Sequence, residues 1–167
     1  MRVAVVGHVE WIEFARVERL PAAGEIVHAS DAWEEPGGGG AVAAVQLARL
    51  AGSCLFLTAL GGEELGHRAK RELEELGVRV EASWRSQPQR RALVHIDSDG
   101  ERTITVIGER LGPYGDEARA TPSPQGLTFA LAEGRTPAEA LAFGARCGAA
   151  CVTGRGPYEA QLRRAAG

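Results

Sequence analysis

Four consecutive glycines, Gly37 to Gly40, stand directly before an Ala- and Leu-rich segment and constrain the fold of this chain more than any other feature. The segment from Ala41 to Leu50 has the composition and apolar spacing of a buried helix, and Gly52 follows it as a C-terminal cap. Glycine is permitted in turns that other residues adopt only with strain. The pattern therefore predicts a glycine-rich turn that leads directly into a buried helix.

Short apolar segments surround this helix and alternate with helical patterns. We expect strands at residues 2–6, 9–17, 53–60 and 78–84, with 25–32 also extended. The first and third of these read as buried and the second as half-exposed. A second helix is expected at 63–76, because apolar residues recur there at helical spacing and Gly77 follows as a cap. Strands that alternate with helices in this way are typical of an α/β protein.

An Asp-Gly pair predicts a β-hairpin after this alternating region. Asp99 and Gly100 lie between extended segments at 92–97 and 102–107, and this pair is a strong signal for a tight turn. The hairpin adds a small antiparallel sheet to the α/β pattern. Beyond it, residues 108–124 have turn or linker composition, helices are expected at 126–133 and from Thr136 to about 152, and Thr136 and Glu139 form a capping box.

Composition excludes several classes of function. The net charge of the 167 residues is −3 with both signs mixed, so we expect no nucleic-acid partner. No apolar run reaches the roughly 18 residues that a membrane helix needs, and we expect no membrane partner. The first residues do not resemble a signal peptide, which predicts a cytoplasmic protein in which three cysteines form no disulfide framework.

An ordered set of short motifs carries a family resemblance. Its N-terminal members are the opening strand with Gly7, the segment 20–25, the glycine-rich turn at 37–44, the stretches 61–66 and 73–78, and the hairpin residues 100–103. Its C-terminal members lie at 131–134 and 138–153. In this order and spacing, over about 1–112 and 126–157, the chain resembles the PfkB/ribokinase family of carbohydrate and nucleoside kinases.

The resemblance implies a fold. It predicts an α/β protein with a ribokinase-like three-layer αβα sheet, shortened here, and a small antiparallel β lid. Residues 1–167 would form a single domain, with lid-like strands at about 9–35 and 78–107 and an irregular junction at 108–125. A shortened sheet exposes strand edges and apolar helix faces. We therefore expect a homodimer formed through the lid-like strands.

The resemblance also implies an activity, which is transfer of the ATP γ-phosphoryl group to a hydroxyl of a sugar or nucleoside with ATP and Mg²⁺ as cofactors. Glu10 and the glycines Gly38, Gly39 and Gly40 would bind the sugar-like substrate. If these residues do not bind substrate, Glu10 is a solvent-facing strand residue and the glycines form a flexible turn. In the family some members hold a monovalent cation where this chain has residues 153–156.

Three residues near the C-terminus would lie at the adenine of the nucleotide. They are Gly144, Cys147 and Gly148, for which tight helix packing is the alternative. Cys147 and Cys151 also stand four residues apart, a spacing that can hold a metal ion, although buried small side chains explain it better. We assign no metal ligands from the sequence. Trp11 and Trp33 either line a sugar or subunit contact or belong to the core.

The chain departs from the family at the position of the catalytic base. In the family this base is the Asp of a Gly-x-Gly-Asp loop, whereas residues 121–125 read Thr-Pro-Ser-Pro-Gln. Asp116 follows a glycine and is the alternative candidate for the base, but a solvated turn residue is the better interpretation of its sequence context. Val42 stands where the family has an Asn. We therefore assign no catalytic residue, and a non-catalytic truncated module for dimerisation or ligand binding is the alternative function.

Overall fold

The computed structural model describes residues 3–112 continuously and separate positions after them. Those positions are 129, 132–136, 139, 143, 146, 147, 156, 158, 159, 161 and 163. The predicted junction at 108–125 is thus described only as far as Gly112, and Asp116 and Cys151 lie outside the described residues.

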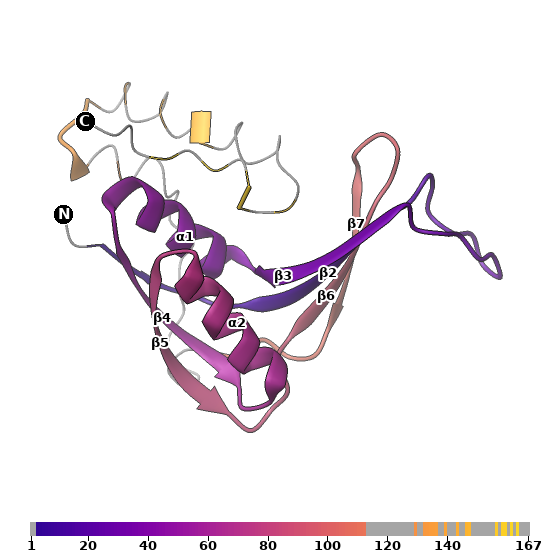
Figure 1. Ribbon diagram of the computed structural model, residues 1–167, viewed down its shortest axis with the longest axis horizontal. Coiled ribbons are helices and arrows are strands. Elements are labelled where there is room, and N and C mark those ends of the chain that lie inside the picture. Colours follow the sequence, from indigo (N-terminus) through magenta and orange to yellow (C-terminus); the bar gives the residue numbers. More distant parts are fainter. Residues whose placement is uncertain are drawn as a thin grey trace.

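A three-stranded parallel sheet forms one half of the described molecule. Its strands are β1 (Ala4–Val6), β4 (Cys54–Gly61) and β5 (Val78–Arg85), in the order β1-β4-β5. The helices α1 (Gly39–Ala51) and α2 (Glu64–Glu75) connect these strands and lie together against the sheet (Figure 1). This is the repeated strand-helix-strand arrangement that the sequence predicts.

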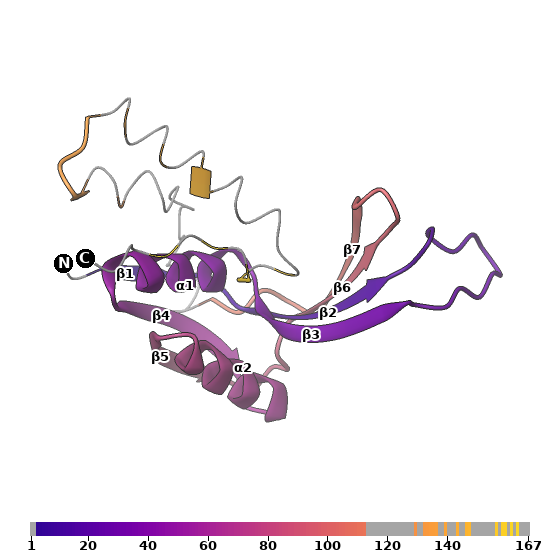
Figure 2. The same cartoon turned by 45° about the horizontal axis from the view of Figure 1, so that its top comes forward.

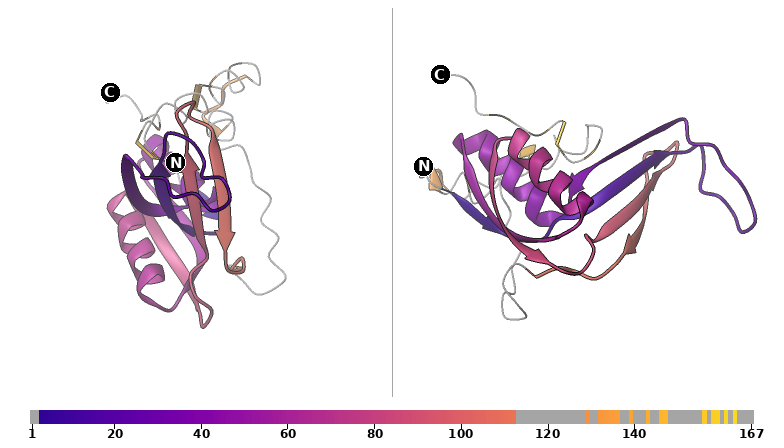
Figure 3. Two further views of the ribbon diagram at one scale, coloured as in Figure 1. Left: turned by 90° about the vertical axis from the view of Figure 1, so that its right-hand side faces the viewer. Right: turned by 60° about the horizontal axis from the view of Figure 1, so that its bottom comes forward.

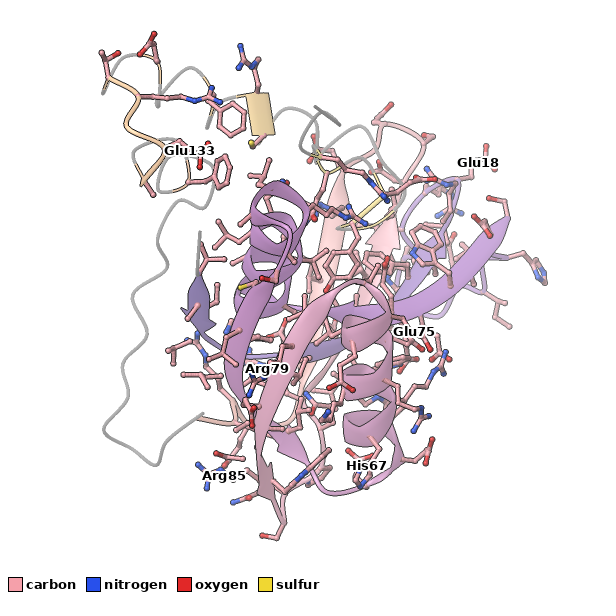
Figure 4. All side chains as sticks on the ribbon, turned by 60° about the vertical axis from the view of Figure 1, so that its left-hand side comes forward. Glu18, His67, Glu75, Arg79, Arg85 and Glu133 are labelled. Carbon is pink, nitrogen blue, oxygen red and sulfur yellow. The ribbon has the colours of Figure 1, made fainter. Side chains whose placement is uncertain are left out.

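Alternation along the strands explains which face of the sheet the helices cover. Phe56 of β4 and Val80 of β5 are buried, whereas Arg79 and Glu81 of β5 are exposed on the other face. Figure 4 shows Arg79 and Arg85 on β5, with His67 on the neighbouring α2. Among the described residues, the helices therefore cover one face of this sheet, which accords with a shortened version of the three-layer fold.

A four-stranded sheet forms the other half. It contains β2 (Glu10–Arg16), β3 (Asp31–Gly37), β6 (Arg91–Ile96) and β7 (Arg102–Ile107), in the order β3-β2-β6-β7. The pairs β2-β3 and β6-β7 are antiparallel, and β2 and β6 are parallel, so the sheet is mixed. Figure 2 shows it extending away from the two helices.

The described residues form two apolar clusters. The larger lies between the helices and the parallel sheet and includes the fully buried Trp11, Phe56 and Leu73. The smaller lies on the four-stranded sheet, where Phe14 packs with Ala92 and Val94. The larger cluster also contains Phe129, Cys147 and Tyr158, so the C-terminal part of the chain contributes to the same core.

Several predicted elements are confirmed. The helices expected at 41–50 and 63–76, the strands at 9–17, 53–60 and 78–84 and the hairpin appear close to their expected bounds. The helices expected at 126–133 and 136–152 lie largely outside the described residues. Asp97 closes the hairpin turn, since its Oδ1 accepts hydrogen bonds from the amides of Asp99 and Glu101 at 3.0 and 2.9 Å. The capping box also forms, because Thr136 N donates to Glu139 Oε2 at 2.9 Å and Glu139 N donates to Thr136 Oγ1 at 3.3 Å.

Three predictions need correction. The extended segment at 25–32 is wrong for most of its length, because β3 begins only at Asp31. The first strand is partly exposed instead of buried, since it lies at the edge of the parallel sheet. The lid-like region at 78–107 is divided, because β5 pairs with β4 in the parallel sheet while β6 and β7 belong to the four-stranded sheet.

No helix within the described part of the chain has the length and apolar character needed to cross a membrane.

Candidate functional site

Two glycines place the start of α1 against the end of β1. A Cβ atom on Gly40 would lie 2.7 Å from the carbonyl carbon of Gly7, and one on Gly7 would lie 2.6 Å from the Cα of Gly40. Contacts this short leave no room for a side chain on either backbone. The last glycine of the predicted turn therefore has a structural function, which is to let the helix begin directly above the first strand.

The preceding glycines form the turn itself. Gly37 ends β3 and pairs with Glu10 of β2, and Gly38 has a φ of +87°, a conformation that favours glycine. Gly38 precedes α1 without a capping side chain, and the first turn of the helix contains no acidic residue. The glycine turn predicted to bind substrate thus lies beside Glu10, since a Cβ built on Gly38 would lie 3.1 Å from the Glu10 backbone nitrogen.

Glu10 lies in a cluster of polar side chains. Its Oε1 atom is 2.9 Å from Nε of Arg90 and 3.7 Å from Nε2 of His8. The Glu10 side chain is 15% exposed, so the expectation of a merely solvent-facing strand residue does not describe it. Both contacts use the same carboxylate oxygen. No described residue donates a hydrogen bond to Oε2, which can therefore accept hydrogen bonds from a ligand.

His8 joins Glu10 to a second arginine. Nη2 of Arg110 lies 2.7 Å from Nδ1 of His8, and since a guanidinium only donates, Nδ1 accepts this hydrogen bond. Nε2 then carries the proton and faces Glu10. Burial, followed by the charges of Arg110 and Arg90, lowers the pKa of His8 to about 4. His8 is therefore neutral near pH 7.

Gln89 connects this cluster to the parallel sheet. Its side-chain Oε1 accepts from Gly61 N at 3.1 Å, and its Nε2 donates to the carbonyl of Val9 at 2.8 Å. Its own amide donates to Oε1 of Glu63 at 2.7 Å, and Glu63 also caps α2. The buried Gln89 thus holds the end of β4, the start of β2 and the start of α2 in fixed relation, immediately before Arg90.

The two tryptophans belong to packing and hydrogen-bond networks. Trp11 is fully buried, its Nε1 donates to Glu34 Oε2 at 2.9 Å, and the guanidinium of Arg68 lies 4.4 Å from its ring centre. Trp33 stacks on Phe14 with ring centres 4.8 Å apart. The core interpretation is therefore confirmed for Trp11, and neither ring contributes to the cluster around Glu10.

The residues predicted to contact the nucleotide are placed only in part. Cys147 is buried in the larger apolar cluster, as the packing alternative expects. Gly144 and Gly148 lie outside the described residues, as do positions 153–155 of the predicted cation loop. In the described residues no group of three His, Cys, Asp or Glu side chains could hold a metal ion. No chemical step is therefore assigned to Mg²⁺ or a monovalent cation here.

Sequence reasoning missed the basic partners of Glu10 and the connecting glutamine. His8 follows Gly7 directly and stands two residues before Glu10, which is a usable local signal for a shared site. Arg90 and Gln89 carry no such signal, because their position depends on the parallel pairing of β2 with β6 across about eighty residues of sequence. Arg110 reaches the site only because β7 returns the chain to it.

Comparison with known proteins identifies the family. The model of the pfkB family carbohydrate kinases matches residues 1–118. Among curated proteins, a Dictyostelium discoideum ribokinase is 28% identical over 64% of this chain and 34% of its own length. An ATP-dependent ribose-1-phosphate kinase from Halopiger xanaduensis is 32% identical over 68% of this chain and 40% of its own length. The chain thus spans between a third and two fifths of these relatives.

Solved structures agree with this assignment. The crystal structure of a Thermotoga maritima ribokinase aligns with a TM-score of 0.75 at 16% identity, covering 98% of this chain and 97% of that chain, and supports the fold. An Arabidopsis thaliana ribokinase complexed with ribose and ATP aligns with a TM-score of 0.54 at 28% identity, covering 77% and 41%. With the family model matched over residues 1–118, the chain belongs to the pfkB family of carbohydrate kinases.

Proposed function

We propose that this chain forms the acceptor-binding side of an ATP-dependent carbohydrate kinase, with a ribose-like sugar or a nucleoside as acceptor. The observation that carries the proposal is the free Oε2 atom of Glu10, beside the glycine turn Gly38–Gly40. A carboxylate with one oxygen held by Arg90 and the other open is suited to accept hydrogen bonds from sugar hydroxyls. The Arabidopsis thaliana relative was crystallised with ribose, which supports a sugar as the ligand of a protein with this fold.

In the proposed reaction the acceptor hydroxyl attacks the γ-phosphorus of ATP. The bond between that phosphorus and the ADP oxygen breaks, a bond to the acceptor oxygen forms, and the hydroxyl loses its proton to a base. The described residues hold and orient the acceptor, and we assign the base to none of them. ATP and Mg²⁺ remain predictions from the family resemblance, and a cytoplasmic location remains a prediction from the N-terminal sequence.

A phosphoryl-transfer assay with γ-labelled ATP over a panel of sugars and nucleosides tests the activity. We expect turnover of a pentose-like acceptor, and we expect Glu10→Gln to raise KM for that acceptor about tenfold or more, because a hydrogen bond to a charged group is lost. Glu13→Gln is the matched control, since Glu13 lies on the same strand and pairs with Arg91 at 2.6 Å. Absence of turnover by pure folded protein would overturn the kinase proposal.

A second candidate function is a ligand-binding or self-associating module that transfers nothing. It is favoured by the exposed apolar side chains of β7, which are Ile104, Val106 and Ile107. The strand lies at the edge of the four-stranded sheet, and such edges readily pair with another chain. Sugar binding without phosphoryl transfer would favour this candidate over the enzyme.

A further inference from the structure

The cluster around Glu10 has an excess of positive charge. It contains two guanidinium groups, Arg90 and Arg110, and one carboxylate, because His8 is neutral. The Glu10 carboxylate pairs with Arg90. No carboxylate of the described residues lies within ion-pair distance of Arg110, whose hydrogen-bond partner is the neutral ring of His8. Within the described residues, one positive charge at the site is therefore left without an anion.

Both arginines also retain hydrogen-bond donors. Arg110 donates through Nη2 to His8, whereas Arg90 is ion-paired with Glu10 at 2.9 Å and its Nε forms no hydrogen bond among the described residues. A guanidinium carries five N–H donors in a planar fork, so the Nη groups of Arg90 and the remaining groups of Arg110 can still donate. Planar forks of this kind match the oxygens of phosphate and carboxylate groups.

The backbone brings the two guanidiniums to the same place. Arg90 directly precedes β6, and Gly108 directly follows β7. The two strands pair Arg91 with Ile107, so Gly108 lies beside Arg90, and a Cβ built on Gly108 would lie 3.8 Å from the Arg90 Cα. Arg110 follows two residues later, and both charges act on His8. The two donors therefore flank the carboxylate proposed to hold the acceptor.

We propose that the acceptor of this site carries an anionic group, a phosphate monoester or a carboxylate, in addition to its hydroxyls. Glu10 accepts from a hydroxyl through Oε2, while Arg110 and Arg90 donate to the anionic group. This inference rests on the proposed function, because it names the substrate class of the same site. Arg110 is then a specificity-determining residue that separates charged acceptors from neutral sugars.

Titration calorimetry of the 167-residue chain tests this selectivity. The ligands are ribose, ribose 5-phosphate, ribonate, inorganic phosphate and a non-hydrolysable ATP analogue. We expect at least one of the two charged sugars to bind about tenfold or more tightly than ribose, the increase expected of one added hydrogen bond between charged groups. Added salt should weaken that charged ligand and leave ribose unaffected. Comparison of ribose 5-phosphate with ribonate distinguishes the two anionic groups.

Arg110→Gln should lower the affinity for the charged sugar to that for ribose, and Arg110→Lys should lower it in part, because the charge remains without the fork. Arg102→Gln, at an exposed position of the same hairpin, is the matched control and should match the parent chain. The far-ultraviolet spectrum checks that each variant is folded.

Equal binding of ribose and the charged sugars would overturn the inference and leave the proposed function standing. An effect of Arg110→Gln on inorganic phosphate and the ATP analogue alone would also overturn it, because the guanidiniums would then serve the phosphates of the donor. If no sugar binds, charged or neutral, both the inference and the proposed function fail.

Discussion

His8 holds its place in the cluster only while its ring is neutral. Arg110 donates to Nδ1 at 2.7 Å, and a protonated ring would present a second donor there and a positive charge beside two guanidiniums. The pKa of His8 is lowered from 6.5 to about 4 in the folded chain. The unfolded chain therefore binds this proton first as the pH falls, and protonation favours unfolding.

We expect this contribution to stability to be present in full above pH 6.5 and to be lost progressively as the pH falls toward 4. Urea unfolding followed by tryptophan fluorescence across this range measures it. His8→Gln should give a flatter dependence of the free energy of unfolding on pH. His28→Gln, in the exposed loop after β2, is the control and should keep the parent profile. An unchanged slope in His8→Gln would contradict the assignment.

The contact between Gly7 and Gly40 gives a second residue-scale prediction. Gly40→Ala should destabilise the chain by about 1–3 kcal/mol, because the added Cβ would lie 2.7 Å from Gly7 and His8 backbone atoms. Gly39→Ala is the matched control, since its Cβ would lie 3.8 Å from the nearest atom, on His8. We expect that variant to be unchanged or stabilised by up to about 1 kcal/mol. Denaturant midpoints compare the two, and equal losses would contradict the steric explanation.

At this scale the sequence predicts the acidic and glycine residues of the site but not its basic ones. Glu10 and Gly38–Gly40 could be chosen because they stand at fixed distances from a recognisable strand and helix. Arg90 and Arg110 are ordinary surface residues by local pattern. Their position beside Glu10 depends on strand pairing, which no local pattern specifies.

At the scale of elements, the two sheets are joined through the buried side chain of Gln89. It accepts a hydrogen bond from the backbone N–H of Gly61 at the end of β4 and donates one to the carbonyl of Val9 before β2. The backbone amide of the same residue donates to Glu63, which caps α2. Figure 3 shows the four-stranded sheet continuing from the parallel sheet in a curve. The orientation of Arg90, whose carbonyl accepts from Trp11 N at 2.8 Å, follows from this junction.

Gln89→Ala should therefore reduce the free energy of unfolding by about 2–4 kcal/mol, because it leaves the Gly61 N–H and the Val9 carbonyl buried without partners. Gln87→Ala, an exposed glutamine of the same connection, is the matched control and should change stability by less than about 0.5 kcal/mol. Thermal and denaturant unfolding give the comparison. A similar small effect for both variants would show that Gln89 does not join the sheets.

Element positions could be predicted from periodicity, but the partners of the strands could not. The segment 78–84 is extended, as its sequence pattern predicts, yet its place in the parallel sheet depends on α2, which returns the chain beside β4. The parallel pairing of β2 and β6 is likewise a non-local contact. Short apolar segments carry a signal for strand formation and none for the neighbour each strand selects.

At the scale of the whole molecule, the edge strand β7 continues an apolar sheet face that is exposed among the described residues. Val106 and Ile104 pair with Ala92 and Val94, which are buried in the smaller cluster, and paired residues of antiparallel strands share one face. Val106 and Ile104 are 44% and 53% exposed. We propose that a second copy of this chain covers this face in the homodimer expected from the sequence.

Light scattering coupled to size exclusion tests this association. We expect the parent chain to elute with the mass of a dimer and Val106→Lys to shift it toward the monomer, because a charge would be buried at the contact. Thr105→Lys, on the opposite face of the same strand, is the control and should remain a dimer. A parent chain that is a monomer at working concentration would refute the dimer.

A map of backbone amide shifts by nuclear magnetic resonance, recorded while ribose and ribose 5-phosphate are added, locates the acceptor site. We expect the largest shifts at Gly38, Gly39 and Gly40 and at Glu10, and we expect Glu10→Gln to weaken them for both ligands. Shifts that cluster elsewhere, for example on the exposed face of α2, or no shifts with any acceptor, would contradict an acceptor site at the glycine turn.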